Sequence, residues 1–312
     1  MNLTVASGIQ SRVLKQAVEF LLARGGPAAV AVRRRRGSTI ILAYHNVVPD
    51  DAPPIGDRSL HLSVTSFRSQ LDRLEETHEI VELTEVQAVP VGLNRPRAAI
   101  TFDDAYRGAL TLALPELARR GLPATVFVAP GLLGSSGCWW DLLAGTDGSG
   151  LLPSVRSHML EVLRGDGATA LAWARSNALP IALLPAHTGI GTEEELRTAA
   201  SLPGIRLGAH TWSHCNLASM DVAAYETELV KPLAWLRQRF ERIVPWVAYP
   251  YGLSAPTSAQ EARRAGYDRA LRIEGGWISS AAISAFVLPR LNVPAAVSPD
   301  GFILRASGLM GS

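Results

Sequence analysis

The chain has 312 residues, of which 47% are apolar and 19% are charged. This composition can bury a large core and has no signature of disorder, and the absence of a long low-complexity linker favours one elaborated domain over two small ones. The formal net charge is only +2, so no global charge indicates a nucleic-acid or polyanionic partner, and we expect none.

The N-terminal part combines a helical pattern with a basic run. Residues 10–24 have the spacing of an amphipathic helix, and Arg33–Arg36 form a run of four arginines before the first predicted strand. Packing of the helix on the domain and a solvated charge run are the favoured interpretations. The alternative is peripheral contact of residues 10–36 with an anionic membrane. We therefore divide the chain into an N-terminal segment, 1–37, and a main domain, 38–312.

Short β-favouring runs recur along the main domain, and helical patterns separate most of them. These runs are Thr39–Tyr44, Glu79–Leu83, Ala98–Phe102, Ala124–Ala129, Ile205–Ala209, Val244–Tyr249, Tyr267–Ile273 and Phe286–Val293. Such alternation predicts an α/β fold with a parallel sheet. Seven or eight β/α units in about 260 residues fit a closed, distorted (β/α) barrel better than an open sheet.

Helical spacing between these runs begins at Phe67 and recurs at Leu112–Arg120 and Ala223–Phe240. Thr192-x-x-Glu195 and Thr257-x-x-Gln260 have the form of capping boxes, which predicts that a helix begins at each of them.

The stretch from Trp139 to Ala200 is longer than an ordinary connection between barrel strands. It contains helical patches, and we predict an insertion of about residues 142–200 on the functional side of the barrel. His158 and His187, which lie in it, are interpreted as ordinary surface or packing histidines.

Two cysteines, Cys138 and Cys215, imply no disulfide framework, and reduced thiols are expected. The start of the sequence lacks the pattern of a signal peptide, and no apolar run reaches the length that spans a bilayer. The expected location is the cytoplasm, with the inner face of the membrane as the alternative for the N-terminal segment.

Two adjacent carboxylates, Asp103 and Asp104, follow the buried strand predicted at Ala98–Phe102. The C-terminal ends of parallel strands are where α/β folds gather catalytic groups. The simpler interpretation is that one of these acids caps the next helix.

A histidine pair, His210 and His214, follows another predicted strand. The spacing H-x-x-x-H allows both imidazoles to reach one metal ion. One aspartate and two histidines leave coordination positions open for water and substrate, and the second aspartate is then free to take a proton.

Three motifs now stand in order along the chain: Thr101-Phe-Asp-Asp104, His210-Thr-Trp-Ser-His214 and Tyr249-Pro-Tyr-Gly252. In order and spacing they resemble the polysaccharide deacetylase family, also called the NodB-homology or carbohydrate esterase family 4 proteins. The resemblance extends from about Thr39 to Val293. It implies a distorted (β/α) barrel and metal-dependent hydrolysis of acetyl groups on sugars.

Carried over by motif, Asp103 resembles the catalytic base, and Asp104, His210 and His214 resemble the ligands of one divalent metal ion. Zn²⁺ is the expected ion, with Mn²⁺, Co²⁺ or Ni²⁺ as alternatives. Tyr251 matches the position whose backbone N–H helps to hold the oxyanion.

The chain departs from the family pattern at two places. Ala248 stands where the family commonly has an arginine that pairs with the base, and we expect Arg290 to replace it. The late Leu-x-His general acid is missing, because Leu291-Asn-Val293 occupies that region. His45, after the first strand, is the candidate acid, with a structural role as the alternative. This early Tyr-His resembles exopolysaccharide-associated deacetylases.

Aromatic side chains near the predicted strand ends are candidates for stacking on sugar rings, with core packing as the alternative for each. They are Trp212, Trp246, Tyr249 and Trp277. The expected activity is removal of an N-acetyl group from an amino sugar in a glycan, glycolipid or glycosylated metabolite. The alternatives are a deformylase or other amide hydrolase on a small substrate, and a non-catalytic glycan-binding protein.

Overall fold

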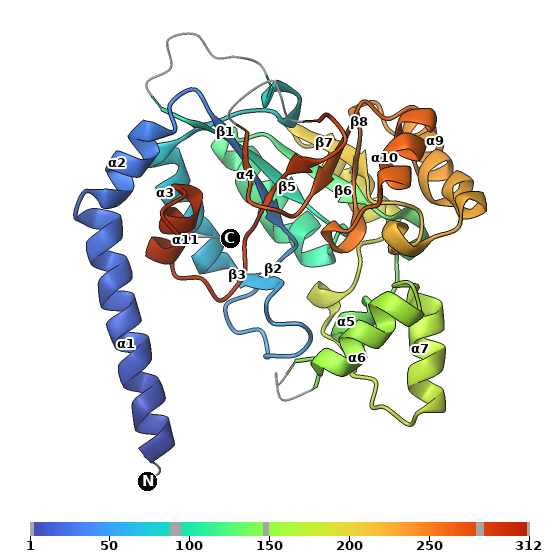
Figure 1. The fold of residues 1–312 in the computed structure, drawn as a ribbon, viewed down its shortest axis with the longest axis horizontal. Helices are drawn as coiled ribbons and strands as arrows, with labels where there is room; N and C mark the ends of the chain where they lie inside the picture. Colours follow the sequence, from blue (N-terminus) through green and yellow to red (C-terminus); the bar gives the residue numbers. More distant parts are fainter. Residues whose placement is uncertain (1–2, 88–94, 146–149, 279–283, 311–312) are drawn as a thin grey trace.

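The computed structural model describes residues 3–87, 95–145, 150–278 and 284–310, with side chains from residue 14 onward except that of Val222. Its centre is a mostly parallel sheet with helices around it (Figure 1). The strands of this sheet are β1 (Thr39–Tyr44), β4 (Glu79–Ile80), β5 (Arg97–Phe102), β6 (Ala124–Val128), β7 (Ile205–Ala209), β8 (Ile243–Ala248), β9 (Arg269–Arg272), β10 (Trp277–Ile278), β11 (Leu288–Pro289) and β12 (Leu291–Asn292).

The strand order makes the sheet a nearly closed barrel. Neighbouring strands follow the path β10-β1-β5-β6-β7-β8-β9-β11, and β12 pairs back onto β1. The short segment 288–292 therefore bridges the two ends, because β11 pairs with β9 and β12 pairs with β1, both in parallel. The predicted distorted (β/α) barrel is confirmed.

The strands lie where apolar runs predicted them because both faces of this sheet are covered. Every residue of β1 and of β6 is buried. A strand that is buried on both faces needs apolar residues at successive positions. Its sequence is therefore a continuous apolar run and not an alternation of apolar and polar residues. A separate pair, β2 (Asn46–Val48) and β3 (His61–Ser63), lies beyond the end of β1.

The helices around the barrel are α3 (Val64–Thr77), α4 (Leu114–Arg120), α8 (Glu193–Ser201), α9 (Lys231–Arg239) and α10 (Pro256–Arg264). The capping box at Thr192 is confirmed, because its hydroxyl accepts from the Glu195 N–H and the Glu195 carboxylate accepts from the Thr192 N–H. The box predicted at Thr257 is wrong. Helix α10 begins at Pro256, and the Ser258 hydroxyl accepts from the backbone N–H of Ala255.

Three further helices, α5 (Trp139–Leu142), α6 (Pro153–Ser157) and α7 (Gly167–Ser176), lie between β6 and β7 in the sequence and form a separate group below the barrel (Figure 1). After them α8 packs against β7, as an ordinary barrel helix does.

The N-terminal segment forms α1 (Leu3–Arg24) and α2 (Pro27–Arg34), and α1 packs against the last helix, α11 (Pro299–Ala306). Of the amphipathic pattern expected over residues 10–24, the side chains of residues 10–13 lie outside the description. None of the described helices is long and apolar enough to cross a bilayer. Cys138 and Cys215 are buried free thiols, as expected.

Candidate active site

The two adjacent acids lie at the C-terminal end of β5. The Asp103 N–H donates to the Tyr44 carbonyl at the end of β1, which continues the sheet by one residue. The chain then turns abruptly, because Asp104 and Ala105 have φ values of 69° and 58°. This turn sends the two carboxylates in different directions, so that one faces Arg290 and the other faces the histidines.

The histidine pair lies at the C-terminal end of β7. His210 continues that strand, with its N–H donating to the Val128 carbonyl. Its Nδ1 lies 2.7 Å from the Ala248 carbonyl oxygen. An imidazole that donates from Nδ1 presents the lone pair of Nε2 on its other side, and this second contact fixes that orientation. Burial lowers the pKa of His210 to about 4, so the ring is neutral near pH 7.

Asp104, His210 and His214, which we call the Asp-His-His triad, converge on one point. The Asp104 Oδ1 lies 3.5 Å from His210 Nε2 and 3.1 Å from His214 Nε2. All three side chains are buried, and their ligand atoms lie within 4.8 Å of one another.

The triad fits a divalent cation. Asp104 Oδ1 is buried and accepts no well-aligned hydrogen bond from any described residue. It faces His210, whose Nε2 presents a lone pair. Electron pairs directed at one another in a buried site are costly unless a cation lies between them. One carboxylate and two imidazoles are the ligand set of an open Zn²⁺-type site.

Backbone strain is concentrated around this point. Seven non-glycine residues in the described chain have positive φ, and five of them are at or beside the site. These five are Asp104, Ala105, Thr211, His214 and Tyr251. Such conformations each cost about 1–3 kcal/mol and persist where the surroundings impose them. The concentration of strain indicates that the fold positions these groups for a function.

Arg290 lies beside Asp103 and binds it with both arms of its guanidinium. Nη1 donates to Oδ1 at 2.7 Å and Nη2 donates to Oδ2 at 2.8 Å. Arg290 is completely buried, and Nη1 also reaches the Thr101 hydroxyl at 3.2 Å. Burial alone would raise the pKa of Asp103, but the charge and hydrogen bonds of Arg290, together with the nearby histidines, outweigh burial and hold that pKa below its ordinary value.

A cavity of about 200 Å³ opens over both acids and both histidines. His45 and Tyr251 also line it, together with Trp140 and Asn292. The Nδ1 of His45 is buried without a hydrogen-bond partner among the described residues. The structure thus places the predicted general acid His45, Tyr251 of the third motif, the two adjacent acids and the histidine pair around one cavity.

A family model described as polysaccharide deacetylase matches residues 91–270, more than half of the chain. The chain belongs to the polysaccharide deacetylase family. Membership supports deacetylation of a carbohydrate as the general activity. A search of curated protein sequences finds no significant match.

Solved structures with the same fold include other deacetylases. The Streptococcus pyogenes deacetylase PplD, in complex with acetate, is 17% identical, with 86% of this chain and 97% of that chain covered and a TM-score of 0.57. A polysaccharide deacetylase from Bacillus cereus is 14% identical, with 86% and 68% covered and a TM-score of 0.59. IcaB from Ammonifex degensii is 19% identical, with 88% and 98% covered and a TM-score of 0.55. At these identities the likeness establishes the fold.

None of the four aromatic residues that were predicted to stack on sugar rings lines this cavity of the deacetylase family member. Tyr249 is completely buried, and its hydroxyl donates to the Phe286 carbonyl, so it belongs to the core. The Trp212 ring is covered by the Lys231 ammonium 3.5 Å from its centre, and neither residue lines the cavity. These contacts were suggested by closeness to the motifs in the sequence, and the structure does not place Tyr249 or Trp212 at the cavity.

A hydrogen-bonded network that the sequence analysis missed supports the cavity wall. The Trp140 indole N–H donates to the Tyr106 hydroxyl at 2.8 Å, and that hydroxyl donates to Asp141 Oδ2 at 2.6 Å. The other Asp141 oxygen lies 2.9 Å from His61 Nε2. The network holds the Trp140 ring 4.8 Å from the His214 ring. The only sequence signal was the run Trp139-Trp140-Asp141.

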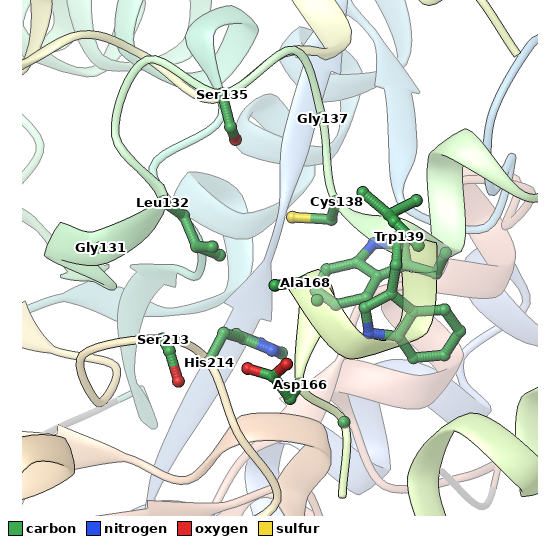
Figure 2. Close-up of a pocket in the computed structure, with 14 residues that line it drawn as sticks. Gly131, Leu132, Ser135, Gly137, Cys138, Trp139, Asp166, Ala168, Ser213 and His214 are labelled. Carbon is green, nitrogen blue, oxygen red and sulfur yellow. The ribbon is translucent and has the colours of Figure 1, made fainter. Parts of the chain in front are cut away.

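A second, mostly apolar cavity of about 240 Å³ adjoins the first, and the two share Trp140 and His214 as lining residues. Figure 2 shows Leu132, Cys138 and His214 directed into it from three different segments. Beside this second cavity, Tyr251 of the barrel makes hydrogen bonds to the segment between β6 and β7. Its hydroxyl donates to the Gly165 carbonyl at 2.9 Å and accepts from the Trp139 indole N–H at 3.0 Å.

Proposed function

We propose that the chain is a metal-dependent hydrolase that removes an N-acetyl group from an amino sugar in a glycan, glycolipid or glycosylated metabolite. The observation that carries the proposal is the buried Asp-His-His triad beside the Asp103–Arg290 pair. Family membership supports the acetyl group and the carbohydrate. The related fold of PplD was solved in complex with acetate, a product of deacetylation.

The triad would hold the metal ion through Asp104, His210 and His214. Its mixed nitrogen and oxygen donors suit Zn²⁺ best and also accept Mn²⁺, Co²⁺ or Ni²⁺. When bound, such an ion acidifies water and polarises a carbonyl group.

Asp103 is the proposed general base. It lies in the same cavity as the triad, with Oδ2 3.9 Å from His210 Nε2. Arg290 keeps the carboxylate ionised and fixes its plane, so Asp103 can accept a proton from the attacking water. An ionised base with a fixed orientation is what the attack on an amide carbonyl requires.

Tyr251 and His45 complete the proposed chemistry. The backbone N–H of Tyr251 would donate to the oxyanion that develops on the carbonyl oxygen. His45 would protonate the amine as the carbon–nitrogen bond breaks, because an amine leaves poorly unless it is protonated. Both residues line the cavity that holds the acids.

The test combines an assay with two variants. Metal-loaded protein is incubated with chitooligosaccharides, lipid-linked N-acetylhexosamine and acetylated xylan, and released acetate is measured. We expect release from an N-acetylated sugar. If the protein releases formate from a formyl sugar but no acetate from these substrates, the small-amide alternative is favoured. Metal binding without any release would favour a glycan-binding protein.

His214→Ala and Asp103→Asn separate the two roles. The first removes a ligand, and we expect loss of both metal and activity. The second keeps the shape of the side chain but cannot take a proton, so we expect full metal content with turnover lower by about 10²–10⁴-fold. Unchanged metal content in His214→Ala would refute the ligand assignment, and near wild-type turnover of Asp103→Asn would refute the base.

A further inference from the structure

Three apolar residues in the described part of helix α1 lie on a face that points away from the protein. Leu14 and Leu21 are 67% and 65% exposed, and Val18 is 46% exposed. At positions i, i+4 and i+7 these three side chains lie on one face of the helix. Figure 1 shows α1 along the outside of the molecule, with its N-terminal part extending past the rest of the fold. A surface helix normally directs such a stripe toward the core.

Contacts on the opposite face fix this orientation. Glu19 is 7% exposed, and its Oε2 accepts from the Ser298 hydroxyl at 2.6 Å. The same hydroxyl caps α11 by accepting from the Gly301 N–H. Ala23, one turn after Glu19, is buried as well. Burying the apolar stripe would require rotating α1 and would break these contacts.

The exposed charges of this region have one sign. Between residues 14 and 37 the only acidic residue is Glu19, which is buried, whereas Lys15, Arg24, Arg33, Arg34 and Arg36 are exposed. The apolar exposure continues on α2, where Val30 is 49% exposed. Beside it, Arg34 and Arg35 line a hollow between α2 and residues 307–309.

We propose that α1 and α2 bind the surface of an anionic phospholipid bilayer. Leu14, Val18 and Leu21 enter the boundary between headgroups and acyl chains, and the arginines of α2 and the following turn contact the headgroups. The apolar stripe suits the acyl chains of the interface, and the cluster of cations that follows suits its anionic headgroups. A second copy of the chain would instead bring like charges together.

The test uses the full chain and vesicle flotation. We expect the protein to float with phosphatidylcholine vesicles that contain phosphatidylglycerol, and to bind them less at high salt because salt screens the cations. Leu14→Ser, Val18→Ser and Leu21→Ser combined should abolish flotation without changing the melting temperature, since the three side chains are already exposed. Arg33→Gln, Arg34→Gln and Arg36→Gln combined should weaken binding by roughly 100-fold, because each cation near such a surface contributes about fivefold.

The matched control removes three exposed apolar side chains elsewhere. Leu152, Val162 and Leu183 of the insertion are 67%, 62% and 92% exposed. Leu152→Ser, Val162→Ser and Leu183→Ser combined should leave flotation unchanged. Absence of flotation, or equal flotation of the α1 variant and wild type, would overturn the proposal. So would a dimer in analytical ultracentrifugation that the α1 substitutions abolish while vesicle binding is absent, since the stripe would then be an interface between copies.

Discussion

At the scale of single residues, the ionisation of Asp103 depends on a cation that is far away in the sequence. Arg290 makes a two-armed contact with it, and both side chains are removed from water. An opposite charge at this distance lowers the pKa of a carboxyl group by about 1–3 units. Ala248 stands where an arginine was expected in the third motif, and Arg290, between β11 and β12, places its guanidinium against Asp103 instead.

Replacing Arg290 should therefore change the pH dependence of the reaction. In Arg290→Gln the pKa of Asp103 rises, a larger fraction of Asp103 is protonated at acidic pH, and the acid limb of kcat/KM moves to higher pH by about 1–3 units. The pH profile of acetate release measures the shift. Arg290→Lys, which keeps the charge, should move the limb less. Arg206→Gln, which removes an arginine from the ion pair with Glu82 on the surface, should not move it at all.

His45 is the second residue whose role can be tested by itself. It lines the cavity and has an unpartnered Nδ1. His45→Ala should slow hydrolysis of an amide by about 10²–10⁴-fold and spare an activated ester, whose leaving group needs no proton. Turnover numbers on the two substrates, with metal content as the control, decide the matter. Equal losses on both substrates would assign His45 to structure or metal binding.

At the scale of elements, helix α5, which leads into the insertion, forms part of the wall of the candidate active site. Trp140 contacts His214, Trp139 donates to Tyr251, and Asp141 anchors the helix through Tyr106. The insertion also reaches the cavity, because Arg156 of α6 lines it and the Gly165 carbonyl accepts from the Tyr251 hydroxyl.

Tyr106→Phe tests this connection. The variant keeps the ring but leaves the Trp140 indole N–H without its acceptor, which costs about 1–3 kcal/mol and loosens the wall. We expect kcat/KM to fall by roughly tenfold with the metal retained. Tyr267→Phe is the matched control, because that buried hydroxyl donates to the Leu229 carbonyl away from the cavity. If both variants lose similar stability and neither loses activity, the network is only structural.

At the scale of the whole molecule, the segment that closes the barrel also brings a residue to the candidate site. The segment that bridges β9 and β1 carries Arg290 between β11 and β12. The triad residues follow the ends of β5 and β7. A metal ion bound by all three would therefore link these two strands. Metal binding should accordingly stabilise the entire fold.

Adding Zn²⁺ at 100 times its dissociation constant should raise the free energy of unfolding by about 2.7 kcal/mol, and the melting temperature by roughly 4 °C for a chain of this size. Thermal denaturation with and without a chelator measures this shift. His214→Ala should lose the shift. His158→Ala should keep it, because the His158 ring packs at a tilt on Trp173 outside the cavity. A shift of equal size in His214→Ala would mean that the ion binds elsewhere.

The sequence by itself determined the class of fold and the main chemical groups of the site. Continuous apolar runs mark buried parallel strands because both faces of each strand are covered, and polar residues after such runs lie at the mouth because parallel strands end at the same edge. Asp103, Asp104, His210 and His214 follow from these local patterns. Arg290 could be predicted only because a family position lacked its cation.

Tertiary structure alone decided which side chains face the cavity. The capping position of α10, the burial of Tyr249, the covering of Trp212 and the outward turn of α1 depend on rotations that local spacing leaves open. The support of Trp140 depends on partners more than 30 residues away in the chain. Such contacts exist only after the barrel has closed and the insertion has packed on it, and no periodicity in the sequence encodes them.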